Sequence, residues 1–234
     1  MLITSLENSK IKEISKLLTT KYRKKEKKFL VEGAHLVKEA RACGILLEAF
    51  SLDEKEGYTQ VTPQIMSKLS NTDTLVSEIG LCKMIDKTEL SNKMLILDQV
   101  QDPGNMGALM RSARAFGFDT IVLGLGCCDI YNDKVIRSSQ GAIFKLNFIN
   151  ANLVEFIPTL KDYKVYGTNV VNGIELTKLE SSNKLAFILG NEGNGVSKEV
   201  EALVDSNIYI SMNDTESLNV SVAGGIIMHY FNNK

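Results

Sequence analysis

Apolar and polar positions in the second half of the chain alternate between strand-like runs and helix-like spacings. Short apolar runs predict strands at residues 94–100, 120–124, 164–170, 185–190 and 207–212. Helical spacing predicts helices at residues 106–116, 133–144, 152–161, 196–204 and 217–231. Such alternation indicates a parallel α/β sheet. Because ligands of these sheets bind beyond the carboxyl ends of the strands, the loops at residues 98–105, 190–195 and 211–217 are the candidate binding segments.

The first part of the chain shows a smaller α/β pattern. Helical spacing predicts helices at residues 5–20 and 34–43, and apolar runs predict strands at 29–31, 46–52, 60–61 and 75–79. A short polar segment follows at residues 88–93. We therefore predict two domains, a small α/β domain at residues 1–88 and a larger one at residues 93–234.

The predicted helix at residues 106–116 is amphipathic. Its apolar residues form one stripe that faces a core, and Gly117 stands where helices commonly end. Arg111 and Arg114 fall on or beside the polar face, toward whatever the preceding Asp-Pro-Gly-Asn loop lines. Two interpretations stay open, an ordinary solvated face or part of a polar site.

Charge is unevenly distributed, although the formal net charge is only -1. Residues 1–30 hold nine lysines and arginines against three glutamates. Most of these bases lie in one run that also contains an aromatic residue, namely Lys21, Tyr22, Arg23, Lys24, Lys25, Lys27 and Lys28. The composition suits phosphate contacts and stacking on a base, with a solvated charged loop as the alternative.

Several classes of protein fit the sequence poorly. The four cysteines show no Cys-x-x-Cys spacing and there are only two histidines, so we expect no metal site, no disulfide framework and a reducing cytoplasm. No apolar stretch is long enough to span a bilayer, and no signal peptide is recognisable. A nicotinamide-binding fold is disfavoured because Gly190, Gly193 and Gly195 form a late loop, whereas a dinucleotide fingerprint stands at the first strand-to-helix turn.

The last predicted helix is apolar almost all round, which predicts that it is buried. Ser217 is positioned to cap it, and Asn219 lies in its predicted first turn. Gly224 and Gly225 weaken an isolated helix by about 1 kcal/mol each relative to alanine. Another backbone that packs closely on these glycines would offset that cost.

Three segments taken together resemble the motifs of the SpoU/TrmH family of RNA ribose 2'-O-methyltransferases. They are Asn105 to Ala113 with Arg111, the Gly-Asn-Glu-Gly-x-Gly loop from Gly190, and the Ser217-Leu218-Asn219 helix start, in the family's order. The resemblance implies a knotted α/β methyltransferase domain with a deep trefoil knot of the SPOUT type, S-adenosylmethionine as cofactor and a homodimer formed through that domain. The opening of the chain is similar to the small RNA-binding domain of many members.

The resemblance also implies roles for individual residues. Arg111 would activate the ribose hydroxyl, Asn105 and Glu192 would orient Arg111 and the substrate, and Ser217 and Asn219 would complete the site. Contacts to the cofactor would come from Gly190, Ile210, Met212, Leu218 and Asn219. Arg114 and Arg137 are further candidates for RNA contacts, with Ser139 beside the latter. Because arginine stays protonated, Arg111 acts either as a strained base or as an electrostatic stabiliser.

One departure from the family pattern concerns residues 210–216, where relatives commonly have Ile-Pro-Met and a loop with glycine. This chain has neither proline nor glycine there, and we expect a differently shaped cofactor loop. The substrate that the resemblance favours is 23S ribosomal RNA. The alternatives are transfer RNA, or a catalytically silent RNA-binding protein that acts in ribosome assembly.

Overall fold

The chain forms two compact units, each with its own sheet. The computed structural model describes residues 2–86, 88–170, 173–180 and 182–232. One unit combines the chain up to Ile85 with Asp129–Phe144, and the other combines Asp86–Cys128 with the chain from Lys145 onward. The predicted α/β class is confirmed. The predicted functional domains at 1–88 and 93–234 stay a prediction, and the compact units differ from them in that Asp129–Phe144 packs with the first unit.

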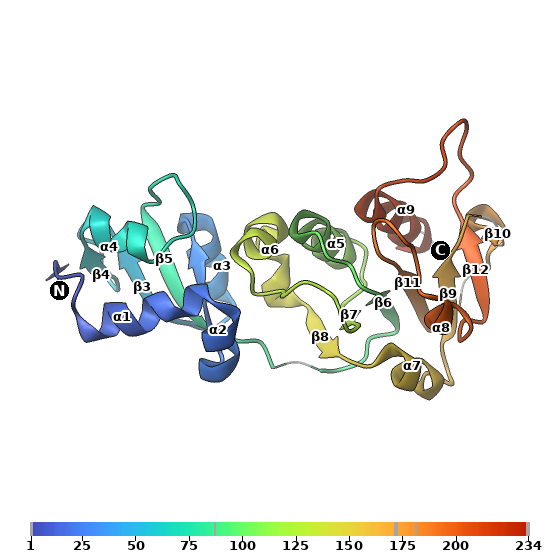
Figure 1. Cartoon of the computed structure of the whole chain (residues 1–234), viewed down its shortest axis with the longest axis horizontal. Helices are drawn as coiled ribbons and strands as arrows, with labels where there is room; N and C mark the ends of the chain where they lie inside the picture. Colours follow the sequence, from blue (N-terminus) through green and yellow to red (C-terminus); the bar gives the residue numbers. More distant parts are fainter. Residues whose placement is uncertain (1, 87, 171–172, 181, 233–234) are drawn as a thin grey trace. The chain divides into compact units, whose positions relative to one another are not determined.

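The first unit contains a five-stranded mixed sheet in the order β1-β4-β3-β5-β2 (Figure 1). Its elements are β1 (Leu2–Ile3), α1 (Ser9–Ser15), a 3-10 turn (Lys16–Leu18), α2 (Thr20–Glu26), β2 (Lys28–Glu32), α3 (Ala34–Ala42), β3 (Leu46–Ser51), β4 (Thr59–Val61), α4 (Pro63–Lys68), β5 (Glu78–Lys83) and α6 (Asp133–Ser139).

Helices cover both faces of this sheet. Ile11 of α1 and Ile65 of α4 share one apolar cluster with strand residues that include Leu81. On the other face, a Cβ at Gly80 would lie 2.8 Å from the side chains of Leu46 and Val31 and 3.4 Å from Val37 of α3, so glycine lets these side chains pack closely. The later segment joins the unit through Tyr131, whose ring lies 4.6 Å from that of Phe29 in β2.

The second unit contains a seven-stranded sheet in the order β10-β12-β9-β11-β6-β7-β8, and all of its described strand pairs are parallel. Its elements are β6 (Lys93–Leu97), α5 (Pro103–Ala115), β7 (Thr120–Leu123), β8 (Asn147–Asn150), α7 (Leu153–Phe156), β9 (Lys164–Thr168), β10 (Ile174–Glu175), β11 (Leu185–Leu189), α8 (Lys198–Glu201), β12 (Ser206–Tyr209) and α9 (Val220–Asn232). Further 3-10 turns lie at Ala142–Lys145, Ile157–Thr159 and Leu176–Lys178.

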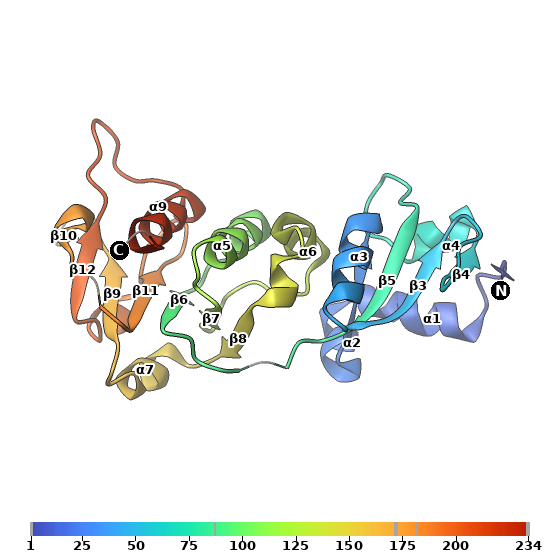
Figure 2. The same ribbon diagram turned by 180° about the vertical axis from the view of Figure 1, so that it is seen from behind.

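The sheet of the second unit is covered on both faces. Figure 2 shows α5 and α9 side by side on one face, with α7 on the other. Val200 of α8 and Leu153 of α7 share an apolar cluster with Ile96 and Ile188 of the central strands. The opposite face of β11 contributes Phe187, whose ring lies 4.8 Å from that of Phe231 in α9. The central strands β6, β7 and β11 are therefore buried on both sides, as their continuous apolar runs predict.

The five strands predicted in the second half are confirmed, and the differences lie mainly at helix ends and in short elements. The helix predicted to start near Met106 begins at Pro103, and the one predicted from residue 217 begins at Val220. The basic run at residues 21–28, for which the sequence predicts no regular element, is largely the helix α2 (Thr20–Glu26). Four short elements were not predicted, namely β1, α4, β8 and β10. The trefoil knot stays a prediction.

Candidate cofactor and RNA site

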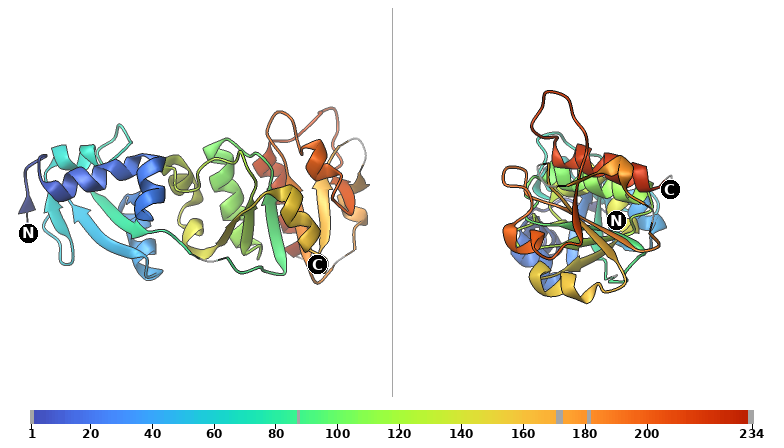
Figure 3. Two further views of the ribbon diagram at one scale, coloured as in Figure 1. Left: turned by 60° about the horizontal axis from the view of Figure 1, so that its bottom comes forward. Right: turned by 90° about the vertical axis from the view of Figure 1, so that its right-hand side faces the viewer.

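The candidate site is built at the carboxyl edge of the parallel sheet. Leu97 at the end of β6 pairs with Leu189 at the end of β11, so the segments that follow these two strands leave the sheet side by side. Beyond β12, the chain projects from the sheet as a long loop before it returns as α9 (Figures 1 and 3). Motif segments that are far apart in sequence therefore meet at one edge, as expected for a parallel sheet.

The first motif segment is a capped helix start. Asp102 is the N-cap of α5, and its Oδ1 accepts a 2.8 Å hydrogen bond from the backbone N–H of Asn105. Pro103 occupies the first helical position, where its missing N–H costs nothing. Asn105 therefore lies in the first turn of α5, which corrects the prediction that it belongs to the preceding loop.

The glycine loop folds back tightly on itself. The backbone groups of Asn191 and Gly195 exchange two hydrogen bonds of 2.9 Å. A Cβ at Gly190 would lie 2.0 Å from the carbonyl carbon of Gly195, so no side chain fits at position 190. The loop is also tied to β6, because the backbone N–H of Ser197 donates a 2.8 Å hydrogen bond to the buried Asp98. Loop shape thus depends on Gly190 and Asp98.

Glu192 joins the glycine loop to the start of α5. Its carboxylate accepts hydrogen bonds from the backbone N–H groups of Asp102 at 3.0 Å and Gln101 at 3.3 Å, and from Nδ2 of Asn105 at 3.2 Å. Partial burial alone would raise the pKa of Glu192. The hydrogen bonds from Asp102, Asn105, Gln101 and the N–H of Glu192 itself outweigh that effect and lower the pKa. The ionised form is therefore the one that holds the two segments together.

Asn219 brings in the third motif segment. It directly precedes α9, and its Oδ1 accepts hydrogen bonds from the backbone N–H groups of Ser221 at 2.9 Å and Val222 at 3.4 Å. Its Nδ2 donates a 3.0 Å hydrogen bond to Oδ1 of Asn105. Asn219 thus caps α9, which corrects the prediction of Ser217 as the cap. The physical reason is that α9 begins three residues later than predicted.

A cavity of about 630 Å³ opens beside these loops. It is lined by all of the predicted cofactor residues, Gly190, Ile210, Met212, Leu218 and Asn219, together with Glu192 and Ser217. Its size is within the usual range for small-molecule sites. Apolar side chains such as Leu189, Ile208 and Ile227 offer a surface for a flat base, and loop backbone groups offer polar contacts. These features fit a nucleoside-containing cofactor.

The loop after β12 turns sharply without glycine. Asp214 adopts a left-handed conformation with φ of 52°. Glycine adopts that conformation most easily, and aspartate is among the few other residues that tolerate it. The loop therefore makes its turn without the glycine that relatives commonly carry there.

Arg111 lies on α5 but does not join the network. Its side chain is exposed, and within the described part of the chain it has neither a hydrogen bond nor an ion pair. The expected pairing with Glu192 and Asn105 is not formed. With 3.6 residues per turn, a residue six positions after Asn105 lies on a different side of the helix. Arg111 is thus free to contact a substrate or a partner chain.

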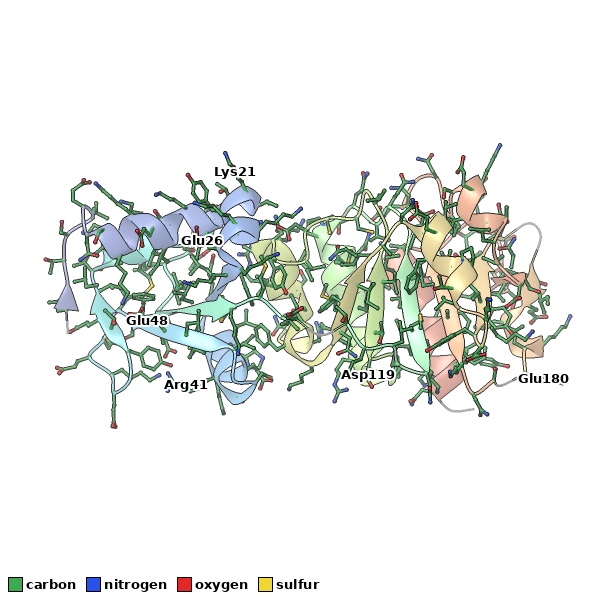
Figure 4. The ribbon with its side chains drawn as sticks, turned by 90° about the horizontal axis from the view of Figure 1, so that it is seen from below. Lys21, Glu26, Arg41, Glu48, Asp119 and Glu180 are labelled. Carbon is green, nitrogen blue, oxygen red and sulfur yellow. The ribbon has the colours of Figure 1, made fainter. Side chains whose placement is uncertain are left out.

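The predicted RNA-contact run divides into exposed and buried members. Lys21 projects from α2 (Figure 4), and Lys24, Lys25 and Lys27 are also exposed. Lys28 and Tyr22 are half-buried, and Tyr22 packs against the core of the first unit. These residues lie near a shallow cavity of about 440 Å³, whose lining includes Lys10, Lys16, Tyr22, Lys25 and Lys28.

Arg23 is a correction to the predicted RNA contacts. Its side chain is buried, and it donates hydrogen bonds to the carbonyl oxygens of Leu17 at 3.0 Å and Leu18 at 2.9 Å. It also donates to Thr20 and forms a 2.6 Å ion pair with Asp129. Arg23 is the buried residue of α2, and these partners compensate for the burial of its charge. Arg23 therefore stabilises the fold.

The remaining arginine candidates are paired. Arg114 is exposed and donates a 2.6 Å hydrogen bond to Asp119. Arg137 lies in the first unit, 2.8 Å from Asp133 and 3.7 Å from Glu32. Ser139 is fully buried, and its hydroxyl donates to the carbonyl oxygen of Ile136. Ser139 therefore has a structural role, and the prediction that it belongs with the candidate RNA-contact residues is wrong.

Part of the cavity wall was not predicted. Thr168 is the last residue of β9, Asn169 follows it, and Lys198 and Glu201 lie on α8. The signal that could have found Thr168 and Asn169 is their position at the carboxyl end of a predicted parallel strand. Across the residues that the structure describes, no cluster of three or more His, Cys, Asp or Glu side chains could hold a metal. No described helix has both the length and the apolar character needed to cross a membrane.

Comparisons with known sequences cover nearly the whole chain. Residues 92–229 match the SpoU rRNA Methylase family, and residues 8–76 match the MRM3-like substrate binding domain. The 23S rRNA (guanosine(2553)-2'-O)-methyltransferase RlmP of Bacillus subtilis is 37% identical over 242 residues, which cover 97% of this chain and 98% of that relative.

Solved structures share the fold along the full length of the chain. A structure described as an RNA 2'-O ribose methyltransferase has a TM-score of 0.81 and 26% identity, over 100% of this chain and 98% of that one. The AdoMet-bound rRNA methyltransferase of Sinorhizobium meliloti has a TM-score of 0.87 over 100% of this chain and 97% of that one. At 23% identity, the second likeness concerns the fold alone.

Proposed function

The chain belongs to the SpoU rRNA methylase family, and from that premise we propose that it transfers a methyl group from S-adenosylmethionine to a ribose 2'-hydroxyl of 23S ribosomal RNA. The target that we propose to examine first is the counterpart of guanosine 2553, the nucleotide named for the Bacillus subtilis relative. Because ribosomal RNA is the substrate, we place the protein in the cytoplasm.

One observation carries the proposal, namely that Asn105 joins all three motif segments beside a single cavity. It donates to Glu192 of the glycine loop at 3.2 Å and accepts from Asn219 before α9 at 3.0 Å. A fold retained only for RNA binding would not require a fixed cofactor cavity of about 630 Å³. The arrangement therefore favours an enzyme over a silent assembly factor.

The cavity supports S-adenosylmethionine binding. When bound, the cofactor supplies the methyl group. The backbone at Gly190, Ile210 and Leu218 is suited to contact its polar groups, and Glu192 keeps the glycine loop in place against α5. Asn219 and Ser217 lie at the same cavity and are proposed to complete the wall toward the ribose.

Arg111 is proposed to act on the ribose. A guanidinium stays protonated at neutral pH, so it is better suited to stabilise negative charge on the ribose oxygen than to remove a proton. Its exposure and lack of an intramolecular partner support this role, because no described residue competes for its donors. The RNA phosphate next to the ribose would bind to the same planar guanidinium group of Arg111.

The first unit is proposed to bind the ribosomal RNA. It contains the exposed lysines of α2, and residues 8–76 match a substrate-binding domain. We further propose a homodimer through the second unit. Val222 is 50% exposed and Ile226 is 39% exposed on α9, and a second copy would remove these apolar side chains from water.

The proposal is tested by supplying the purified protein with methyl-labelled S-adenosylmethionine and three RNAs, namely unmodified 23S ribosomal RNA, unmodified 16S ribosomal RNA and unmodified transfer RNA. Label should enter the 23S species, and nuclease digestion should return it as a 2'-O-methylated nucleoside. Label in transfer RNA alone would favour a tRNA enzyme. Binding of 23S ribosomal RNA with no label transferred would favour the silent assembly factor.

A further inference from the structure

The wall of the cofactor cavity contains an acid, Glu201, that none of the three motif segments includes. Glu201 is the last residue of α8, and together with Asn169 it lines the cavity. Its Oε1 accepts a 2.5 Å hydrogen bond from Nδ2 of Asn169 and a 2.8 Å hydrogen bond from Nδ2 of Asn207. Two side-chain amides therefore fix one oxygen of this carboxylate.

The two asparagines are themselves placed by the sheet. Asn169 follows β9, Asn207 lies in β12, and these strands pair with Asn207 opposite Gly167. A Cβ at position 167 would lie 2.4 Å from Oδ1 of Asn207, so glycine is needed for this amide to lie where it does. The orientation of Glu201 is thus determined by neighbouring strands and not by a mobile loop.

Holding Glu201 in this way has a cost. The Oδ1 of Asn207 is buried and has no hydrogen-bond partner among the residues that the structure describes. Buried carbonyl oxygens usually have a donor, and leaving one unsatisfied is unfavourable. The alternative amide orientation would place that oxygen against the Glu201 carboxylate, which repels it. The side chain of Asn207 therefore donates a hydrogen bond to Glu201, although its own carbonyl oxygen is left without a donor.

The second oxygen of Glu201 is left available. In the described part of the chain, Oε2 accepts no hydrogen bond, and the carboxylate forms no ion pair. An ionised carboxylate has about four acceptor positions, and here the two known hydrogen bonds both use Oε1. The cavity wall thus presents a half-buried negative group whose remaining acceptor positions suit a donor from a bound molecule.

We propose that Glu201 accepts a hydrogen bond from an amino group of S-adenosylmethionine and so positions the cofactor in the cavity. The inference rests on the proposed function. The cofactor has two amino groups, the α-ammonium of its methionine part and the 6-amino group of its adenine. Both are hydrogen-bond donors, and a hydrogen bond to a carboxylate is stronger than one to a neutral acceptor.

The variant that tests this role is Glu201→Gln. Glutamine keeps one carbonyl oxygen for Asn169 and Asn207, but it replaces the other acceptor with an NH2 group that repels an amino donor. Glu199→Gln is the matched control, because Glu199 lies on the same helix, is exposed and makes the same change in net charge. Thermal melting of both variants checks that the fold is retained.

The readout is calorimetric binding of three compounds to the wild-type protein and both variants. The compounds are S-adenosylhomocysteine, its analogue without the α-amino group, and its analogue with hypoxanthine in place of adenine. Glu201→Gln should bind S-adenosylhomocysteine about tenfold or more weakly than wild type, whereas Glu199→Gln should match wild type. If the wild-type protein and Glu201→Gln bind one analogue with equal affinity, that analogue lacks the amino group that Glu201 contacts.

Two outcomes overturn the inference while the proposed function stands. One is unchanged binding of S-adenosylhomocysteine by a folded Glu201→Gln variant. The other is an equal loss of affinity for all three compounds, which would assign Glu201 to a contact other than an amino group. Failure of the wild-type protein to bind S-adenosylhomocysteine would overturn the proposed function and this inference with it.

Discussion

The side-chain amide of Asn219 donates a 3.0 Å hydrogen bond to Oδ1 of Asn105, and so joins the starts of α9 and α5. The other end of the Asn105 amide donates to Glu192. One asparagine therefore uses both its acceptor and its donor to connect three segments that the chain order separates widely. The geometry of the cavity depends on this single amide.

Asn105→Ala should weaken S-adenosylmethionine binding by about tenfold, because the variant makes neither hydrogen bond and the glycine loop is held less firmly. Calorimetry measures the affinity. Asn92→Ala is the control, because Asn92 is exposed, does not line the cavity, and its side chain makes no hydrogen bond with a described residue. Equal affinity of Asn105→Ala and Asn92→Ala would remove the bridging role.

Asn105→Ala should also change the pH at which Glu192 becomes protonated. The folded-state pKa of Glu192 is lowered, so its hydrogen bonds contribute stability that is complete above the ordinary pKa of about 4.3 and is lost as the pH falls through the folded value. Asn105→Ala removes one donor and should move the pKa of Glu192 upward. Carboxyl NMR titration measures it, and an unchanged pKa would contradict the contact.

Gly190→Ala should abolish cofactor binding. The added Cβ would lie 2.0 Å from the carbonyl carbon of Gly195, and the loop must open to accommodate it. Gly193→Ala is the matched control, since its nearest neighbour to a new Cβ would be 3.6 Å away. Calorimetry should find near wild-type affinity for Gly193→Ala. Retained binding by Gly190→Ala would show that the loop shape does not matter.

Replacing Lys24, Lys25, Lys27 and Lys28 with alanine should weaken RNA binding and flatten its salt dependence. For every phosphate that is no longer neutralised, the slope of log affinity against log salt should fall by about 0.7. Binding at several salt concentrations measures this slope, and an unchanged slope would make residues 24–28 a solvated surface.

Arg23→Ala should act differently and lower the free energy of unfolding by about 3 kcal/mol, because it removes one partner of a buried ion pair. Chemical denaturation measures this change, and an unchanged free energy of unfolding would contradict the structural role of Arg23.

Ile226→Lys should convert the expected dimer into a monomer, because it places a charge on the exposed apolar face of α9. Val154→Lys is the control, since Val154 is 46% exposed on α7, which covers the opposite face of the sheet. Sedimentation measures both. If the wild-type protein is a fully active monomer at micromolar concentration, the homodimer proposal is wrong. Gly224 itself does not support the dimer. A Cβ there would lie 2.5 Å from Leu109 and 2.7 Å from Leu189, so the close contact that this glycine permits is made within one chain.

The sequence predicts the order of strands and helices well because buried parallel strands and amphipathic helices have strong periodic signals. Helix starts are less readable. The segment Asp102-Pro103-Gly104 contains turn-forming residues, yet Asp at the N-cap with Pro at the first helical position is a helix start. In α2, charged residues conceal a helix whose inward side carries the buried Arg23 and the half-buried Tyr22.

The candidate site is predictable only in part, for a similar reason. Gly190, Ile210 and Leu218 are identified by motif resemblance, and all three line the cavity. Glu201 is not, because its role depends on Asn169 and Asn207, which reach it through strand pairing. The sequence also did not predict that Glu192 lacks a contact with Arg111. Glu192 binds the backbone N–H of Asp102 and the amide of Asn105, and Arg111, six residues after Asn105, lies on another side of α5.

Arg111→Ala should lower single-turnover methylation by about 100-fold or more, roughly 2.7 kcal/mol, while cofactor affinity and melting temperature stay near wild type. Arg111 is exposed and has no partner among described residues, so its loss should not disturb packing. Arg111→Lys should not restore the rate, because lysine lacks the planar fork. A near wild-type rate for Arg111→Ala would move the search to Arg114, Arg137 or Glu192.

The most direct test of the account is a map of ribose methylation in total RNA from cells that contain the wild-type gene, lack it, or carry Arg111→Ala. The account predicts one 2'-O-methylated position in 23S ribosomal RNA that is present with the wild-type gene and absent from the other two strains. Maps that are identical in all three strains, or a site absent only from transfer RNA, would contradict the assignment to 23S ribosomal RNA.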